Sequence, residues 1–213
     1  NNTATQHSSA ALEVSLSASY SKSSYLKITD SIFEDNSATY SAAVKTDTED
    51  TKISRTTFLR NSATLGDGGA VTLDCTYRTT CNMSIVDSIF INNSALLNGG
   101  AVRWTKIEPY MSNNTFINNT ASYGNDIASF GINLKSLDFD KEITTTKNSK
   151  VGTSSYLNIG SGQRLPMTIT IALVDKYGQV VKTDNSSIGT ISPVNTASVT
   201  VTGNTRIQAD RGV

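Results

Sequence analysis

One short phrase is written four times in this chain of 213 residues, and it constrains the fold more than any other feature. The phrase consists of a phenylalanine, two variable residues, an asparagine, a hydroxyl residue and an alanine. Its copies begin at Phe33, Phe58, Phe90 and Phe116, which lie 25, 32 and 26 residues apart. A repeat of this period predicts stacked supersecondary units that bury a core only together.

A second phrase follows each copy of the first and marks another corner of the unit. It reads Gly-Gly-Ala-Val at residues 68–71 and 99–102, Ser-Ala-Ala-Val at 41–44 and Ser-Ala-Ala-Leu at 9–12. A late version is Gly-Asn-Asp-Ile at residues 124–127. We therefore expect about five coils, with paired glycines supplying positive φ angles at one corner.

The units lack the apolar spacing of helices and contain short alternating segments instead, such as Val71–Leu73 and Val102–Trp104. Ser, Thr, Val and Ile are abundant, and strands favour β-branched residues. The sequence therefore predicts an all-β fold, a right-handed parallel β-helix over residues 1–130 with coils about 4.8 Å apart. Equivalent phenylalanines then stack in one internal column, made of Phe33, Phe58, Phe90 and Phe116.

The asparagine of the phrase is expected to form a second internal column, made of Asn36, Asn61, Asn93 and Asn119. A buried side-chain amide carries donors and an acceptor that all need partners. Asparagines stacked in register meet this need by bonding one another, as amide ladders do in cross-β structures. A chance Asn-Ser turn signal is the alternative, and four copies at a fixed distance from phenylalanine disfavour it.

The alternation of Phe-x-x-Asn with Gly-Gly-Ala-(Ile/Val/Leu) over residues 9–128 resembles the repeats of chlamydial polymorphic outer-membrane proteins. It is equally similar to the long β-helical surface proteins of ciliates. This resemblance implies a pectin-lyase-like β-helix on a secreted or cell-surface protein that serves adhesion or structure.

The only cysteines, Cys75 and Cys81, bracket the insertion that lengthens one unit to 32 residues. A disulfide that closes this loop is the preferred interpretation, and it implies an oxidising compartment. Two free thiols and half of a metal site are the alternatives. A metal site needs further ligands, and the single histidine, His7, is distant in sequence. No metal or cofactor is expected.

Six Asn-x-Ser/Thr sequons predict N-linked glycosylation, at Asn1, Asn82, Asn92, Asn113, Asn118 and Asn185. Three of them share columns with charged residues of other coils, which predicts that they face solvent. Asn92 and Asn118 align with Asp35 and Arg60, whereas Asn113 aligns with Asp30, Arg55 and Asp87. The sequons favour a eukaryotic glycoprotein and therefore the ciliate-like resemblance.

The composition argues against several kinds of partner. Basic and acidic residues each number 18, so the formal net charge is zero and no basic stripe for nucleic acid is expected. No apolar segment approaches the length of a membrane span, so no direct membrane insertion is expected. The chain begins Asn1-Asn2-Thr3, which predicts a processed chain or part of a longer one.

The repeat stops after Ile127, and a different pattern follows. We expect residues 131–150 to be a linker with one connecting strand, and residues 151–213 to form an antiparallel immunoglobulin-like β-sandwich. The segment at residues 173–181, Leu-Val-Asp-Lys-Tyr-Gly-Gln-Val-Val, resembles bacterial-invasin and filamin modules and predicts a hairpin. About six strands are predicted where such a sandwich has seven, so the last strand is expected from further residues or from a neighbour.

A polysaccharide-degrading enzyme is the least favoured function. Such chemistry needs two carboxylates converging in a cleft, whereas Asp30, Asp74 and Asp87 are expected in outward columns. We expect a non-enzymatic extracellular structural glycoprotein, a segment of a fibre, filament or cell-surface coat that associates head to tail through strand edges. An adhesin or carbohydrate-binding surface module is the alternative. Tyr40 and Tyr123 are expected to face inward, which weighs against it.

Overall fold

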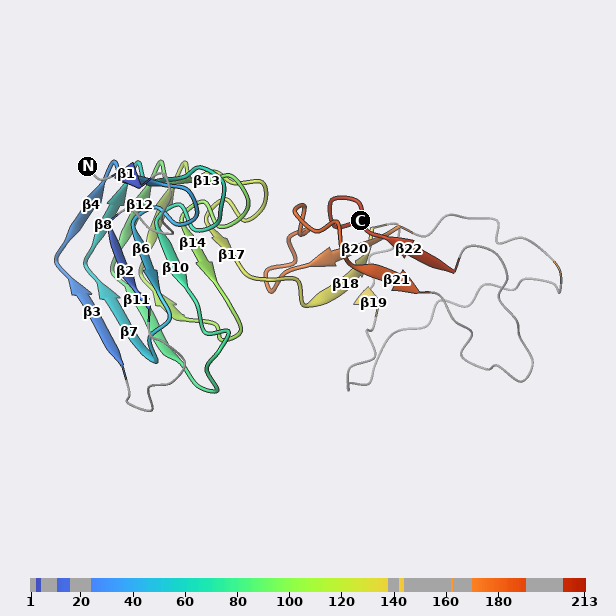
Figure 1. Ribbon diagram of the computed structural model, residues 1–213, viewed down its shortest axis with the longest axis horizontal. Coiled ribbons are helices and arrows are strands. Elements are labelled where there is room, and N and C mark those ends of the chain that lie inside the picture. The colour runs from blue at the N-terminus through green and yellow to red at the C-terminus, as the bar shows by residue number, and fades with distance from the viewer. Residues whose placement is uncertain are drawn as a thin grey trace. The chain divides into compact units, whose positions relative to one another are not determined.

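The computed structural model describes residues 3–4, 11–15, 24–137, 142–143, 162, 170–190 and 205–213. Every element in these ranges is a β-strand (Figure 1). The chain divides into two compact units, Asn1–Phe130 and Gly131–Val213.

The first unit is a parallel β-helix of five coils. Its widest sheet stacks five parallel strands, namely β2 (Leu12–Val14), β6 (Val44–Thr46), β10 (Val71–Leu73), β14 (Val102–Trp104) and β17 (Ile127–Ala128). Equivalent residues pair directly, so that Val44, Val71 and Val102 form one line. The predicted all-β fold with a parallel β-helix is confirmed.

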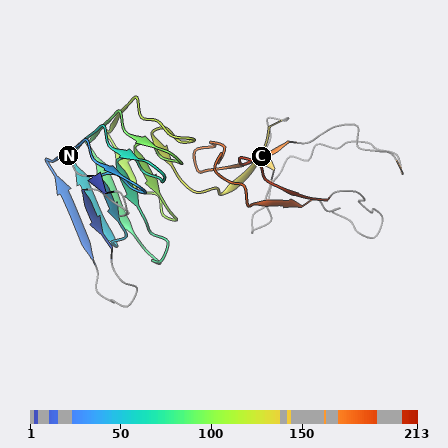
Figure 2. The same cartoon turned by 45° about the horizontal axis from the view of Figure 1, so that its top comes forward.

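Three four-stranded sheets complete the wall of the β-helix, and their strands stack side by side in Figure 2. One contains β3 (Tyr25–Thr29), β7 (Asp50–Ser54), β11 (Asn82–Val86) and β15 (Tyr110–Ser112). The next, which we call the phenylalanine sheet, contains β4 (Ile32–Glu34), β8 (Thr57–Leu59), β12 (Ile89–Ile91) and β16 (Thr115–Ile117). The last contains β1 (Thr3–Ala4), β5 (Ser37–Ala38), β9 (Ser62–Ala63) and β13 (Ser94–Ala95).

Phenylalanine rings fill the interior in an unbroken stack. Successive ring centroids are 5.2, 4.9 and 5.0 Å apart, and the ring planes are tilted by 10° or less, from Phe33 through Phe58 and Phe90 to Phe116. Phe58 and Phe90 are completely buried. Burial of one such side chain is worth about 1.5–3 kcal/mol, so the stack is a major source of stability for the β-helix.

The asparagines form an amide ladder beside the rings. Nδ2 of Asn36 donates to Oδ1 of Asn61 (2.8 Å), which repeats from Asn61 to Asn93 (2.9 Å) and from Asn93 to Asn119 (3.0 Å). From Asn61 onward, each Nδ2 also donates to the backbone oxygen of the phenylalanine one coil back, at 3.0–3.1 Å. Nδ2 of Asn119 donates to Oδ1 of Asp126 (3.0 Å), which ends the ladder.

A second internal polar column was not predicted from the sequence. It lies two residues before each phenylalanine and includes Thr56, Ser88 and Asn114. The backbone N of Thr56 donates to Oγ of Ser88 (3.2 Å), and the backbone N of Ser88 donates to Oδ1 of Asn114 (2.9 Å). Hydroxyl residues are common at exposed turns, so their presence in the sequence did not indicate this internal role.

The paired glycines lie at the corner before the five-stranded sheet. Gly68 and Gly99, the first glycine of each pair, have φ angles of 65° and 66°. The second glycine answers a different need, because a Cβ atom at Gly69 would overlap the backbone oxygens of Gly100 and Ser94 in the next coil. Close contact between coils therefore requires the second glycine, and positive φ favours the first.

The prediction that two tyrosines face inward is half wrong. Tyr123 is buried, and its hydroxyl donates to the backbone oxygen of Ser129 (2.8 Å). Tyr40 is 57% exposed. The backbone of Tyr40 lies so close to Gly66 of the next coil that a Cβ atom there would overlap it. At this corner the two coils are in close backbone contact, and the ring of Tyr40 lies on the outer surface of the β-helix.

The second unit contains antiparallel pairs in the part of it that the structure describes. β18 (Asn133–Ser136) pairs with β19 (Glu142–Ile143) and β20 (Ile171–Val174), and β21 (Ile188–Thr190) pairs with β22 (Arg206–Gln208). The predicted hairpin turn is present, since the backbone N of Gly178 donates to the oxygen of Asp175 (3.0 Å).

The first unit ends at Phe130, and part of the predicted linker at residues 131–150 lies in a strand of the second unit. β18 falls within the predicted linker at residues 131–150, but it pairs with β20 and so belongs to the second unit, which begins at Gly131. Near the end of the chain, the oxygen of Gly212 accepts a hydrogen bond from Leu173 N (2.7 Å). Much of the predicted sandwich, at 151–161, 163–169 and 191–204, lies outside the described residues, so the immunoglobulin-like fold and its missing strand stay predictions.

Candidate functional site

Two columns of turn residues run along the outside of the β-helix, one at each edge of the phenylalanine sheet. The first turn column contains Asp30, Arg55, Asp87 and Asn113, and the second contains Asp35, Arg60, Asn92 and Asn118. All of them adopt left-handed backbone angles, with φ between 47° and 54°. Asparagine and aspartate tolerate this region better than other non-glycine residues, so the corner geometry itself favours these side chains.

An ion pair holds the first turn column in the N-terminal coils. Nε of Arg55 donates to Oδ1 of Asp30 (2.6 Å), and Nη2 donates to Oδ2 (2.8 Å). Hydrogen bonding from Arg55 lowers the pKa of Asp30 from 3.8 to about 2. In the later coils, Nδ2 of Asn113 donates to Oδ1 of Asp87 (2.6 Å). The first turn column therefore contains an ion pair in its N-terminal coils and a sequon in its last coil.

The second turn column has the same division. Arg60 bonds to Oδ1 of Asp35 (2.7 Å) and to Oε1 of Glu34 (2.5 Å). Hydrogen bonds donated by Arg60 lower the pKa of Asp35, and the same bonds to Asp35 and Glu34 raise the pKa of Arg60. Asn92 and Asn118 follow in the next two coils, where they stand about 4.8 Å apart along the stack. Two sequons therefore occupy equivalent positions of adjacent coils.

The described sequon asparagines are all exposed, namely Asn82, Asn92, Asn113, Asn118 and Asn185. Asn1 lies outside the described residues. Asn82 begins β11, and its Nδ2 donates to Oδ1 of Asp50 (2.8 Å). Exposure is a requirement for carrying a glycan, and glycosylation itself stays a prediction.

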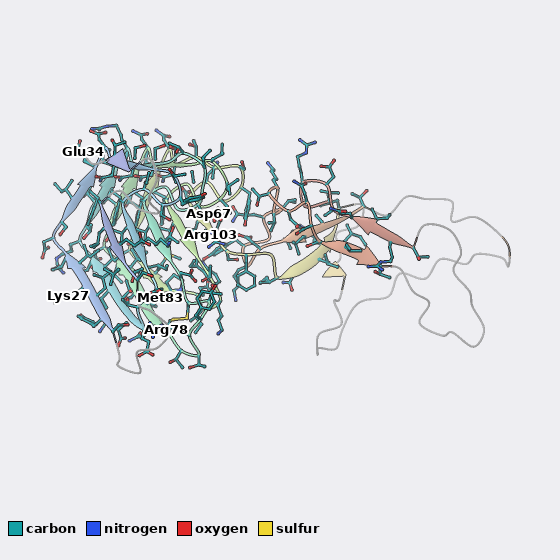
Figure 3. The ribbon with its side chains drawn as sticks, in the orientation of Figure 1. Lys27, Glu34, Asp67, Arg78, Met83 and Arg103 are labelled. Carbon is teal, nitrogen blue, oxygen red and sulfur yellow. A yellow bond between two sulfur atoms is a disulfide. The ribbon has the colours of Figure 1, made fainter. Side chains whose placement is uncertain are left out.

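The structure joins Cys75 and Cys81 in a disulfide, with Cα atoms 6.2 Å apart. Cys75 is buried in the core, whereas Tyr77 within the loop is 89% exposed. Arg78 anchors the loop, since its Nη1 lies 3.5 Å from Oε1 of Glu49 (Figure 3). The insertion is therefore a tethered loop that presents a tyrosine to solvent.

A charged cluster at the glycine corner was missed in the sequence. Nδ2 of Asn98 donates to Oδ1 of Asp67 (2.5 Å), and Nε of Arg103 lies 2.9 Å from Oδ2 of Asp67 (Figure 3). Nε of Arg103 also donates to Oδ1 of Asn98 (2.9 Å). Burial raises the pKa of Asp67, and the charge of Arg103 opposes that rise. Asp67, Asn98 and Arg103 bond one another across two coils. The role of the cluster is therefore explained by the contact that it makes between these coils.

The carboxylates that the enzyme alternative would need take part in structural hydrogen bonds. Asp30 and Asp87 belong to the first turn column. Asp74 accepts from the backbone N of Thr76 (2.8 Å) and from Oγ1 of Thr105 (2.8 Å). Burial acts to raise the pKa of Asp74, but these bonds outweigh it and the pKa is lowered. Within the described ranges, no three His, Cys, Asp or Glu side chains are grouped as a metal site requires.

Comparison with known proteins identifies one matching segment. Residues 87–103 match the Chlamydia polymorphic membrane protein (Chlamydia_PMP) repeat. This segment contains one Phe-x-x-Asn phrase and the Gly-Gly-Ala-Val phrase after it, so the chlamydial part of the predicted resemblance is supported. The match points to a surface or outer-membrane type of protein.

The other predicted resemblances, to ciliate surface proteins and to invasin or filamin modules, stay predictions. No curated protein and no solved structure matches the chain. The part of the chain that the structure describes contains no helix of the length and apolar character needed to cross a membrane.

Proposed function

We propose that this chain is a non-enzymatic structural segment of an extracellular fibre, filament or cell-surface coat that carries N-linked glycans. The observation that supports it is the regularity of the β-helix, in which rings and amides continue in one register from Phe33 to Asn119. Each coil contacts only its neighbours, so the length of such a solenoid grows with the number of coils. A rigid element of extensible length suits a fibre or a coat.

Association head to tail through strand edges is the finer part of the proposal. β1, β2, β3 and β4 lie at one edge of their respective sheets. Edge strands offer unpaired N–H and C=O groups, and a further strand adds to them by β-augmentation. A neighbouring copy would use this edge, as would preceding coils of a longer chain.

The opposite end of the β-helix has polar residues in place of the corner phrase. Asn125 and Asp126 stand where the coil before them carries Gly100 and Ala101. Oδ1 of Asn125 accepts from the backbone N of Ala121 (3.1 Å), and Asp126 ends the amide ladder. Polar terminal repeats are typical caps of solenoids, which favours the first coil as the end that joins.

An adhesin or carbohydrate-binding module is the second candidate, and exposed tyrosines favour it. Tyr25 and Tyr110 belong to strands of one sheet and are 57% and 66% exposed, and Tyr77 projects from the disulfide loop. Tyrosine is enriched at binding surfaces because its ring offers apolar area and a polar tip.

Electron microscopy and sedimentation of the purified glycosylated chain test the proposal. Filaments whose length grows with protein concentration are expected. Monomers at every concentration, combined with glycan binding that is lost in Tyr110→Ala, would support the adhesin instead. Mass spectrometry of the sequon peptides tests the glycoprotein part separately.

A further inference from the structure

The outer face of the phenylalanine sheet carries five aliphatic side chains. Its outward side chains alternate with the buried rings and form two lines along the stack. One line contains Ile32, Thr57, Ile89 and Thr115, and the other contains Glu34, Leu59, Ile91 and Ile117. Ile32, Ile89 and Ile117 are 72%, 39% and 43% exposed. Apolar side chains that gather on one exposed face can mark an interaction surface.

The size of this face limits what can cover it. The strands are three residues long and four coils deep, which gives roughly 200 Å² at ordinary strand spacing. A stable protein interface buries about 800 Å² on each partner. The face is therefore too small for a second copy of the chain, and a few sugar residues would be enough to cover it.

The residues that border the face change along the stack. In the two N-terminal coils, ion pairs occupy both borders, made by Arg55 and Arg60. In the two later coils, Asp87 and one sequon occupy the first border, and two sequons occupy the second. Asn113 lies in the first turn column, and Asn92 and Asn118 lie in the second, directly after Ile91 and Ile117.

Aliphatic residues directly precede the two sequons of the second turn column. In the line next to that column, the first coil carries Glu34, which is bonded to Arg60. The second coil carries Leu59, and the sequon-bearing coils carry Ile91 and Ile117. Three of the four residues in this line are therefore aliphatic, and two of them stand beside predicted glycans.

We propose that the N-linked glycans of Asn92, Asn113 and Asn118 lie over the outer face of the phenylalanine sheet and cover Ile91 and Ile117. The inference rests on the proposed glycosylation and adds a position and a role to these glycans. The first sugar, an N-acetylglucosamine, has an acetamido methyl group and apolar C–H faces. Removal of such apolar surface from water, together with the isoleucines, supplies the driving force.

The sequon variants are chosen to fit the corners. Aspartate is native to the second turn column at the same φ, as Asp35 shows. An aspartate at position 113 would instead face the carboxylate of Asp87, which accepts from Asn113 at 2.6 Å, whereas glycine adopts positive φ without strain. The test variant is therefore Asn92→Asp, Asn113→Gly and Asn118→Asp together, secreted from a glycosylating host. The matched control is Asn82→Gln, which removes a sequon from a different sheet and keeps a side-chain amide beside Asp50.

The measurement is the fluorescence of anilinonaphthalene sulfonate, a dye that binds exposed apolar surface. The triple variant is expected to bind roughly twofold more dye than the wild type, and Asn82→Gln is expected to match the wild type. Adding Ile91→Thr and Ile117→Thr to the triple variant should return dye binding to the wild-type level. Threonine is native to the same outward face, as Thr57 and Thr115 show.

The outcomes separate this inference from the proposed function. Unchanged dye binding in the triple variant, with the three sites occupied in the wild type, would overturn the inference. A rise that persists after the Ile→Thr changes would overturn it too, because the dye would then bind elsewhere. Glycans at Asn82 and Asn185 but not at the turn columns would refute the inference alone. A wild type that carries no glycan at any sequon would refute the proposed glycoprotein as well.

Discussion

Asn93→Ala tests whether the amide ladder holds the β-helix together. Asn93 is completely buried. Its Nδ2 donates to Asn119 Oδ1 and to Phe58 O, both at 3.0 Å. Its Oδ1 accepts from the backbone N and the Nδ2 of Asn61, at 3.0 and 2.9 Å. The substitution removes all four bonds at once.

The expected cost follows from the groups that lose their partners. The backbone N of Asn61 and the oxygen of Phe58 lose their bonds to Asn93 inside the stack. An unsatisfied buried group costs about 1–3 kcal/mol, and the space left by the side chain adds to this. We expect a loss of about 3–6 kcal/mol in the free energy of unfolding. That is a large part of the roughly 5–15 kcal/mol that stabilises a typical domain.

The assay can report on the β-helix alone. Trp104 is the single tryptophan of the chain and is 3% exposed in the β-helix, so its fluorescence follows unfolding of that unit. Urea unfolding of Asn93→Ala is compared with Asn92→Asp, an exposed neighbour whose new residue matches Asp35 in the same column. The control is expected to stay within about 0.5 kcal/mol of the wild type. Equal losses in the two variants would refute the assignment of the internal column.

Three further outcomes are expected. Gly69→Ala should lower the urea midpoint of Trp fluorescence, because its Cβ atom would overlap backbone oxygens of the next coil; an unchanged midpoint would show that the coils can separate at no cost. Reduction of Cys75–Cys81 should cost about 2 kcal/mol, the chain-entropy estimate for so short a loop, as measured by unfolding with and without reductant; no difference would mean that the loop is ordered without its bridge. Arg55→Gln should raise the pKa of Asp30 from about 2 toward 3.8, as followed by NMR titration of the carboxyl group. Because the folded-state pKa is lowered, this pair contributes stability above pH 3.8 that is lost as the pH falls toward about 2. A pKa for Asp30 that is the same in both proteins would contradict the hydrogen-bonded pair.

The parts of the fold that the sequence predicted are those with a strict repeat. Phenylalanine and asparagine recur at one fixed distance in the sequence. Only stacking in register brings each ring onto the next ring and each amide onto the next amide, so the fixed distance predicts that stacking. The same register separated Asn92, which is exposed, from Asn93, which is buried. A one-residue offset thus carried enough information to assign opposite sides of the wall.

The parts that were missed depend on contacts between residues without a shared pattern. Ser88 is an internal hydroxyl, but its column also contains threonine and asparagine, so no single residue type marked it. Asp67 meets Asn98 and Arg103 only because the glycine corners bring them together. β18 joins the second unit through β20, which is distant in sequence. Such pairings depend on tertiary structure, and composition alone does not reveal them.

The amide ladder gives the β-helix an electrical polarity. In each rung, one side-chain N–H group of Asn36, Asn61 or Asn93 points toward the later coil, where it meets the amide oxygen of the next asparagine. Aligned amide dipoles reinforce one another in a low-dielectric interior, much as peptide dipoles do along an α-helix. The carboxylate of Asp126 lies at the positive end of this line of dipoles, where a negative charge is favoured. A coil that joined at the first-coil end would extend the line only if its own amides pointed the same way, so in the proposed assembly the interior would favour one direction of growth.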